Sequence, residues 1–146
     1  MKDGRFRASA MSDHKVILNE HDVLLRDLRS VSHWEADLLR ERKVRLQLAR
    51  DLHSLQVRLR RHFSTEESGA YLAEISSRKP SARATLQALH NEHGMLLDLL
   101  SNLENACLDQ DYEAGAQLAE RLGQWLDMLK LHERRETALI QDVFRS

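Results

Sequence analysis

The stretch NEHDVLL, residues 19–25, returns almost unchanged as NEHGMLL at residues 91–97. Each copy places one histidine, His21 or His93, three and four residues before a pair of leucines. Residues at these spacings share one face of a helix, and an apolar face of this kind packs into a core. A histidine on that face is buried, and a buried imidazole needs a polar partner. The repeat therefore predicts a helical protein in which matching histidines from two halves of the chain point inward.

A His-x-x-x-Glu pair follows each copy of the repeat. His62 and Glu66 lie within HFSTEE, and His132 and Glu136 lie within HERRE. Residues four apart on a helix have Cβ atoms ~5–6 Å apart, so each pair can approach one metal ion or a pair of ions. One such pair alone is more often a surface ion pair, but both pairs here continue the apolar stripe of their helices. With the two solitary histidines they offer four imidazoles and two carboxylates, which we interpret as a metal site.

The composition favours a helical bundle of one domain. The 146 residues include only five Gly and one Pro, with 42% hydrophobic and 31% charged residues, which leaves little turn-forming material for a many-stranded sheet. Apolar residues recur at helical spacing in four segments, and the proposed ligands fall on the same inward stripes. We predict an all-α fold, an antiparallel up-down-up-down four-helix bundle.

The four inward stripes contain the following residues: Ile17, His21, Leu24, Leu28 and Val31; Leu48, Leu52, Leu55, Leu59, His62 and Glu66; Leu86, Leu89, His93, Leu96, Leu100, Leu103 and Cys107; Leu118, Leu122, Trp125, Leu129, His132, Glu136, Leu139 and Val143.

The boundaries between these segments are readable in part. Equal arms on either side of a turn place the first turn within Trp34 to Lys43. The same rule places the last turn at residues 112–113, close to the short connection expected at Leu108 to Asp111. The mixed segment from Ser68 to Lys79 reads as a long connection, and Pro80 suits the first turn of the third helix. We expect a flexible leader over residues 1–11 and the bundle domain over residues 12–146.

Charge and cysteine content limit the class of protein. The net charge of −1 gives no global field for nucleic acid, and no apolar stretch approaches the roughly 20 residues that span a membrane. The first residues have no apolar run typical of a secretory signal, although Met11 could be the natural start. The single Cys107 excludes an internal disulfide. We therefore expect a cytoplasmic protein that binds neither nucleic acid nor membrane.

The donor types indicate which metal would bind. Imidazole with carboxylate suits iron, zinc or manganese, and the lack of thiolate ligands argues against a structural zinc site of the finger type. Six donors exceed the need of one tetrahedral ion, whereas two bridging carboxylates with two histidines per ion describe a dinuclear centre.

Taken as a set, the solitary histidine, HFSTEE, the second NEH and the last His-x-x-x-Glu pair resemble the hemerythrin-like, or HHE, domain from about Ser12 to Phe144. The resemblance implies a four-helix bundle around two oxo- or hydroxo-bridged non-haem iron ions, with zinc or manganese less favoured. It implies His21, His62, His93 and His132 as terminal ligands, and Glu66 and Glu136 as bridges.

Two positions depart from the oxygen-carrying members of this family. Leu89 stands where those proteins have a further histidine, and Thr137 stands where they have an aspartate, so Glu136 takes over at a shorter spacing. His90 could replace the missing nitrogen, although it lies about 60° off the inward stripe. The alternative is a histidine at the flank of a helix interface. Iron binding is therefore the firmer expectation, and oxygen binding the weaker one.

The remaining polar groups near the stripes have simpler roles. We expect Glu67 and Glu92 to be outer groups that accept hydrogen bonds from ligand histidines. His53 should face solvent, His14 should lie too far along the helix to share an ion, and His33 should fall in the first turn.

Three functions fit these residues. The first is a binding or sensing protein for dioxygen, iron or redox state, with no catalytic residue and a separate, unidentified protein partner. The second is a di-iron oxidase, or an enzyme that reduces peroxide or nitric oxide. The third is a metal-free helical interaction module.

Overall fold

The computed structural model is almost entirely helical in the part of the chain that it describes. No strand occurs among those residues, which confirms the all-α fold class. The expected leader at residues 1–11 lies outside the described part, as do most of the first predicted turn, the last turn at residues 112–113 and half of the connection before it. The described residues are 14–26, 28, 39, 41–109 and 115–145.

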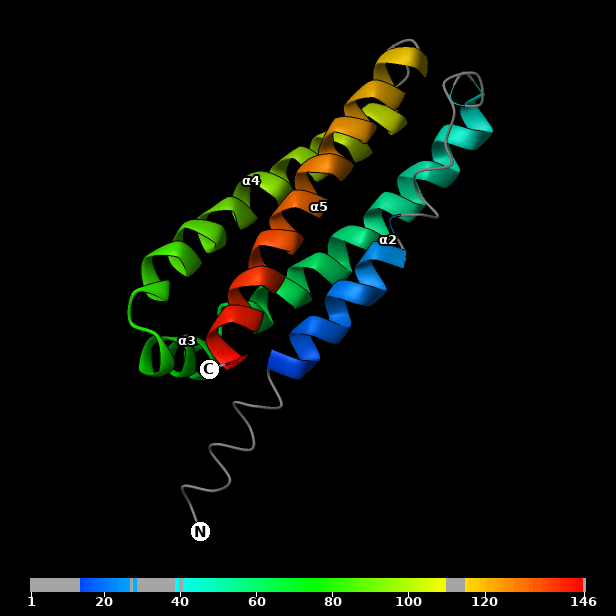
Figure 1. Cartoon of the computed structure of the whole chain (residues 1–146). Coiled ribbons are helices and arrows are strands. Elements are labelled where there is room, and N and C mark those ends of the chain that lie inside the picture. The colour runs from blue at the N-terminus through cyan, green and yellow to red at the C-terminus, as the bar shows by residue number, and fades with distance from the viewer. Residues whose placement is uncertain (1–13, 27, 29–38, 40, 110–114, 146) are drawn as a thin grey trace.

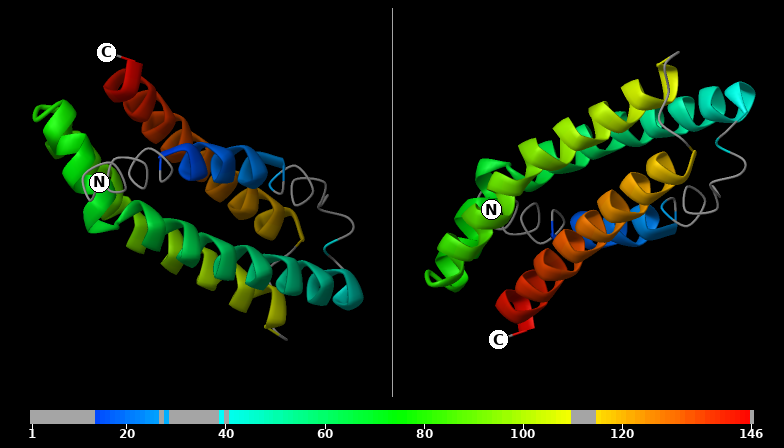
Figure 2. Two further views of the ribbon diagram at one scale, coloured as in Figure 1. Left: turned by 90° about the horizontal axis from the view of Figure 1, so that it is seen from below. Right: turned by 90° about the horizontal axis from the view of Figure 1, so that it is seen from above.

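Of the four labelled helices in the described part of the chain, three are long and one is short. A helix over residues 14–26 precedes them, and Figure 1 shows all of the longer segments running alongside one another, with the short one across one end. In both views of Figure 2, α2 lies beside α4, and the 14–26 helix lies beside α5. The labelled helices are α2 (Arg42–Glu66), α3 (Gly69–Arg78), α4 (Ala82–Leu108) and α5 (Gly115–Arg145).

The predicted inward stripes are buried. Every stripe residue that the structure describes is at most 5% exposed except Leu139, which is partly buried beside a fully buried Ile140. The stripe over α2 shows why this helix is long: its buried residues continue at helical spacing from Leu48 to Glu66 without a break. None of the described helices is long and apolar enough to cross a bilayer.

The expected long connection between the second and third stripes is wrong, because most of it is the helix α3. The Ser68 side chain caps this helix by accepting a hydrogen bond from the backbone N–H of Tyr71 at 3.4 Å. Tyr71 and Ile75, one turn apart, are both 0% exposed and anchor the helix. Pro80 stands just before α4 rather than in its first turn, since Ser81 is the N-cap.

The apolar core is divided into two clusters. The larger cluster fills the middle and far end of the bundle, and includes Leu59 and Leu129. The smaller cluster joins Ile17, α3 and the end of α5. Each fully buried leucine contributes about 1.5–3 kcal/mol. Between the two clusters, each long helix places histidines and glutamates at the same level, so the polar residues form one buried layer.

Candidate metal centre

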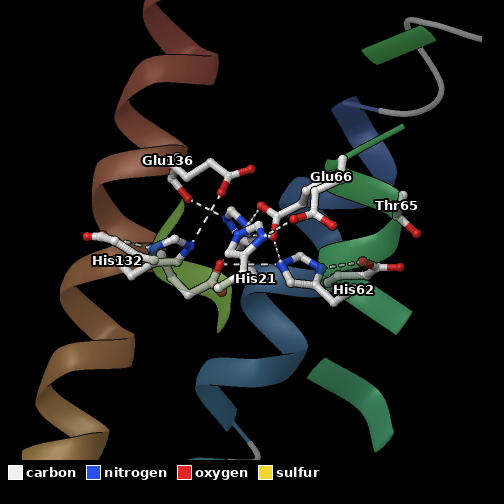
Figure 3. A network of polar contacts seen from close by, with 12 residues as sticks. His21, His62, Thr65, Glu66, His132 and Glu136 are labelled. Carbon is white, nitrogen blue, oxygen red and sulfur yellow. Dashed lines mark hydrogen bonds and ion pairs between the residues drawn. The ribbon is translucent and has the colours of Figure 1, made fainter. Parts of the chain in front are cut away.

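The six predicted ligands lie together in this buried layer. Figure 3 shows His132 and Glu136 of α5 facing His62 and Glu66 of α2, with His21 between the two helices. His93 joins them from α4, where its ring is 5.0 Å from that of His132. Their exposed fractions are His21 2%, His62 3%, Glu66 0%, His93 3%, His132 2% and Glu136 0%.

The donor atoms fall into two groups of four, within each of which all atoms lie within 4.8 Å of one another. Glu66 belongs to both groups, as expected of a bridging carboxylate, whereas Glu136 belongs only to the second. We call these groups site A (His21, His62, Glu66 and Glu133) and site B (Glu66, His93, His132 and Glu136).

Site A is the tighter of the two. His21 Nε2 lies 2.6 Å from Glu133 Oε2, and His62 Nε2 lies 3.0 Å from Glu66 Oε1. In site B, His93 Nε2 lies 3.6 Å from Glu66 Oε1, and His132 Nε2 lies 3.7 Å from Glu136 Oε2. The shorter distances of site A indicate direct ion pairing.

Glu133 belongs to site A but is not among the ligands predicted from the sequence. Its side chain is 1% exposed, and it approaches both His21 and His62 from α5. It was overlooked because it follows His132 directly, which rotates it about 100° off the predicted stripe. A second apolar stripe on α5 offered the signal: Leu126 and Ile140 are buried seven residues before and after Glu133.

Each of the four histidines predicted as ligands contacts a polar group through its other ring nitrogen. The Nδ1 atoms of His62, His93 and His132 lie 2.5, 3.2 and 3.3 Å from glutamate oxygens, and His21 Nδ1 lies 2.6 Å from the hydroxyl of Thr137. Such contacts fix the ring and direct Nε2 toward a metal. The contacts expected of Glu67 and Glu92 with these histidines are therefore confirmed. The three acceptors are Glu20 for His62, Glu67 for His93 and Glu92 for His132.

The inward atoms lack regular hydrogen bonds. Among the described residues, the Nε2 atom of every ligand histidine is buried without a hydrogen-bond partner of ordinary geometry. The same holds for both carboxylate oxygens of Glu66, Glu133 and Glu136. Unsatisfied buried polar atoms are costly. Their convergence on two points is what a pair of metal ions would satisfy, so the residues present fit such ions.

In site A, the pKa shifts favour protonated histidines paired with ionised carboxylates. Burial lowers the pKa of His62, but hydrogen bonds to Glu133 and Glu66 outweigh burial and raise it to about 11. The pKa of His21 is raised for the same reasons. Burial opposes ionisation of Glu133, yet hydrogen bonds from the two histidines lower its pKa. The histidines are thus cationic and the carboxylates anionic.

Site B holds fewer ionised groups than site A. Burial, a hydrogen bond to Glu66 and the nearby charges of Glu66 and Glu133 raise the pKa of Glu136 to about 12, so this carboxyl keeps its proton. Burial lowers the pKa of His93. Burial also opposes ionisation of Glu66, but hydrogen bonds from Glu136, His21 and His62 lower its pKa. Only Glu66 brings a full negative charge to this site.

Two further buried groups flank site B. His90 is 6% exposed, and its ring lies 5.1 Å from that of His93. Of the described residues it belongs to neither group of four donors, so its role as a ligand stays a prediction. Tyr71 reaches the site from α3, with its ring 6.5 Å from that of His90.

The other histidines behave as expected where they are described. The side chain of His53 is 63% exposed and contacts Glu104. His14 stacks on Phe144 at a centroid distance of 4.0 Å, away from the sites. His33 lies outside the described residues. The indole N–H of Trp125 donates to the Leu96 carbonyl at 2.9 Å, as expected of a core residue.

A surface groove opens onto site A. It lies between the 14–26 helix and α5, has a volume of about 410 Å³, and is lined in part by His21, Glu133 and Thr137. Leu18 and Leu25 form apolar parts of its wall. Site A is therefore the part of the layer nearest to this opening.

Comparison with known proteins agrees with the donor set. A family model described as the hemerythrin HHE cation binding domain matches residues 12–143. No curated protein and no solved structure matches the chain significantly.

Proposed function

The chain belongs to the hemerythrin HHE cation-binding domain family, as its motifs predicted, and from this premise we propose that sites A and B hold a pair of metal ions. The observation that carries the proposal is the position of Glu66, whose carboxylate belongs to two groups of four buried donors. A carboxylate shared in this way can bridge two ions. We further infer that the longer helices form an antiparallel four-helix bundle around them.

Iron is the metal that we propose. Each site combines two imidazoles with two carboxylates and offers no thiolate, which suits iron and, less well, zinc or manganese. Glu66 would bridge the ions, Glu133 would complete site A, and Glu136 would complete site B. A bridging role for Glu136 stays a prediction.

We propose that the iron pair binds dioxygen or responds to oxygen, iron or redox state. When bound, iron would supply one-electron redox chemistry and a position for a small diatomic ligand. The chain itself supplies the surroundings: the groove lined in part by His21 and Glu133 is the route that we propose for a small molecule to site A. Buried leucines such as Leu59, Leu96 and Leu129 restrict water below the layer.

A second candidate function is a di-iron oxidase, or an enzyme that reduces peroxide or nitric oxide. Glu133 is the observation that favours it, because it adds a third buried carboxylate to the donor set. An additional anionic ligand stabilises ferric over ferrous iron electrostatically, which opposes reversible release of dioxygen.

The location and partners of the protein are also proposals. We propose a cytoplasmic protein, since its only cysteine, Cys107, is free and buried. We propose that residues 12–146 form the functional domain, that neither nucleic acid nor membrane is a partner, and that any signal passes to a separate protein.

Metal analysis of protein produced in iron-replete medium tests the proposal. We expect close to two irons per chain, with His53→Ala as a control that keeps both. A fully folded chain that takes up no metal would support the third function, a metal-free interaction module. It would contradict both the binding or sensing protein and the di-iron enzyme.

Oxygen exposure after anaerobic reduction separates the first two functions. A visible absorption change that reverses on deoxygenation supports binding or sensing. Rapid irreversible oxidation, with turnover of added peroxide, supports the enzyme.

A further inference from the structure

Tyr71 presents an unexplained polar group beside the metal centre. Its side chain is 0% exposed, and its hydroxyl is buried without a hydrogen-bond partner among the described residues. Leaving a buried hydroxyl unsatisfied costs free energy, whereas phenylalanine would fill the same space without that cost. A tyrosine at this position therefore calls for an acceptor that the metal-free site does not supply.

Glu136 is the neighbour that could become this acceptor. The two side chains are close enough for a hydrogen bond, although its geometry is not ordinary in the metal-free protein. Both carboxylate oxygens of Glu136 are also buried without a hydrogen-bond partner of ordinary geometry among the described residues. A carboxylate must lose its proton to ligate a metal. Loading site B would thus create a negatively charged acceptor next to an unused donor.

We propose that Tyr71 is a positioning residue of site B, whose hydroxyl donates a hydrogen bond to the Glu136 carboxylate when a metal ion is bound. This inference rests on the proposed metal pair. The hydrogen bond would be charge-assisted, and such bonds are shorter and stronger than neutral ones. It would hold one carboxylate oxygen and leave the other to face the ion.

The arrangement of α3 supports this role. Tyr71 and Ile75 are the buried residues of α3, and both pack in the smaller apolar cluster with Ile17 and Ile140. The Tyr71 ring is therefore fixed by packing that does not depend on the hydroxyl. Because the ring is held from below, its hydroxyl is available at the level of the metal layer.

Tyr71→Phe tests the proposal, because it removes the hydroxyl and keeps the ring. Zinc is a suitable probe, since it binds imidazole and carboxylate without redox change. In chelator competition we expect the variant to bind one of its two zinc ions, that of site B, about 10- to 100-fold less tightly than the wild type. The thermal midpoint of the metal-free variant should be equal to or higher than that of the wild type, while that of the zinc-loaded variant should be lower. A purely structural role would shift both midpoints in the same direction.

Trp125→Phe is the matched control. It also removes a buried donor, but one that is already satisfied by the Leu96 carbonyl within the larger cluster. We expect it to lower the thermal midpoints of both forms and to leave zinc affinity unchanged.

Three outcomes would overturn the proposal. A wild-type chain that binds no metal would overturn it together with the proposed function. A wild-type chain that binds two ions, with affinities that Tyr71→Phe leaves unchanged, would overturn this inference alone. A visible absorption band of the ferric protein that Tyr71→Phe abolishes would show the phenolate bound to iron, and would replace the hydrogen bond by direct ligation.

Discussion

Sites A and B are built from the same kinds of side chain but hold different charges. In site A, two histidines of raised pKa face the ionised Glu66 and Glu133 at distances down to 2.6 Å. In site B, His93 Nε2 lies 3.6 Å from a Glu66 oxygen and His132 Nε2 lies 3.7 Å from a Glu136 oxygen. Glu136 is protonated there, and the pKa of His93 is lowered. Ion pairs join the groups of the metal-free site A, whereas in site B the Glu136 carboxyl keeps its proton.

Because of this difference, an entering metal ion must displace protons from different groups at the two sites. An ion entering site A competes with protons on histidine, and an ion entering site B competes with the proton of a carboxyl group. Glu66 couples the two events because it belongs to both sites. The following predictions test this division.

The largest effect is expected for Glu66→Ala. Because Glu66 is shared, its loss should remove both ions, so that iron analysis falls from close to two per chain to near zero. A variant that retained one tightly bound ion would show that the two sites do not depend on this carboxylate.

Glu133→Gln and Glu136→Gln should each remove one ion. The first should empty site A and the second site B, leaving about one iron per chain in either case. Glu133→Gln should also destabilise the metal-free protein by about 3–5 kcal/mol, since it leaves the buried cationic His21 and His62 with fewer partners. Denaturant unfolding measures this loss. If Glu133→Gln kept two irons, Glu133 would be no ligand.

Metal binding should release protons. At pH 6 the protons of His21, His62 and Glu136 must all leave, so at least three should be released per chain as both sites fill. Calorimetry of zinc binding in buffers of different ionisation enthalpy measures the number. Affinity should therefore rise with pH and fall in acid. Release of less than one proton would contradict the assigned charges.

The metal-free protein should show a matching dependence of stability on pH. The pKa of His62 is raised from 6.5 to about 11, so its contribution is complete below pH 6.5 and is lost as pH rises toward 11. The pKa values of Glu66 and Glu133 are lowered, so their contribution is complete above pH 4.5 and is lost in acid. Denaturant unfolding should find the greatest stability between these limits; stability that rises steadily from pH 7 to 11 would contradict the ion pairs.

Thr137→Val is expected to have the smallest effect, confined to site A. It removes the hydroxyl that contacts His21 Nδ1 and should weaken the site A ion by about 10-fold or somewhat more. Thr65→Val is the control, since the Thr65 hydroxyl donates to the Arg61 carbonyl of its own helix and points away from the layer in Figure 3. Chelator competition should show a weaker site A ion in Thr137→Val than in Thr65→Val. Equal metal affinities of the two variants would show that the Thr137 hydroxyl does not support site A.

The parts of the molecule that the sequence predicted well are those that helix periodicity determines. His21, His62 and His93 each follow an apolar stripe, and a stripe has only one inward direction. Once several stripes carry donors at the same level, their convergence follows from packing alone.

Glu133 was not predicted because α5 packs against two other helices, so two of its faces point inward. Its neighbour His132 faces α4, where it contacts Glu92, whereas Glu133 faces His21 of the 14–26 helix. A sequence does not specify which flank of a stripe meets a second helix until its neighbours are placed.

Tyr71 escaped prediction for another reason. Its helix, α3, has only Tyr71 and Ile75 as buried residues, which is too few to form a recognisable stripe. The glycine and serines around them resemble a connection, and only the smaller apolar cluster shows that the segment is anchored.

The most direct test of the paired sites is the metal content of three proteins prepared in parallel: the wild type, Glu133→Gln and Glu66→Ala. Two bridged sites predict about two, one and zero irons per chain, with all three proteins folded by circular dichroism. A folded wild-type chain with no iron, or a Glu66→Ala variant with as much iron as the wild type, would contradict the account.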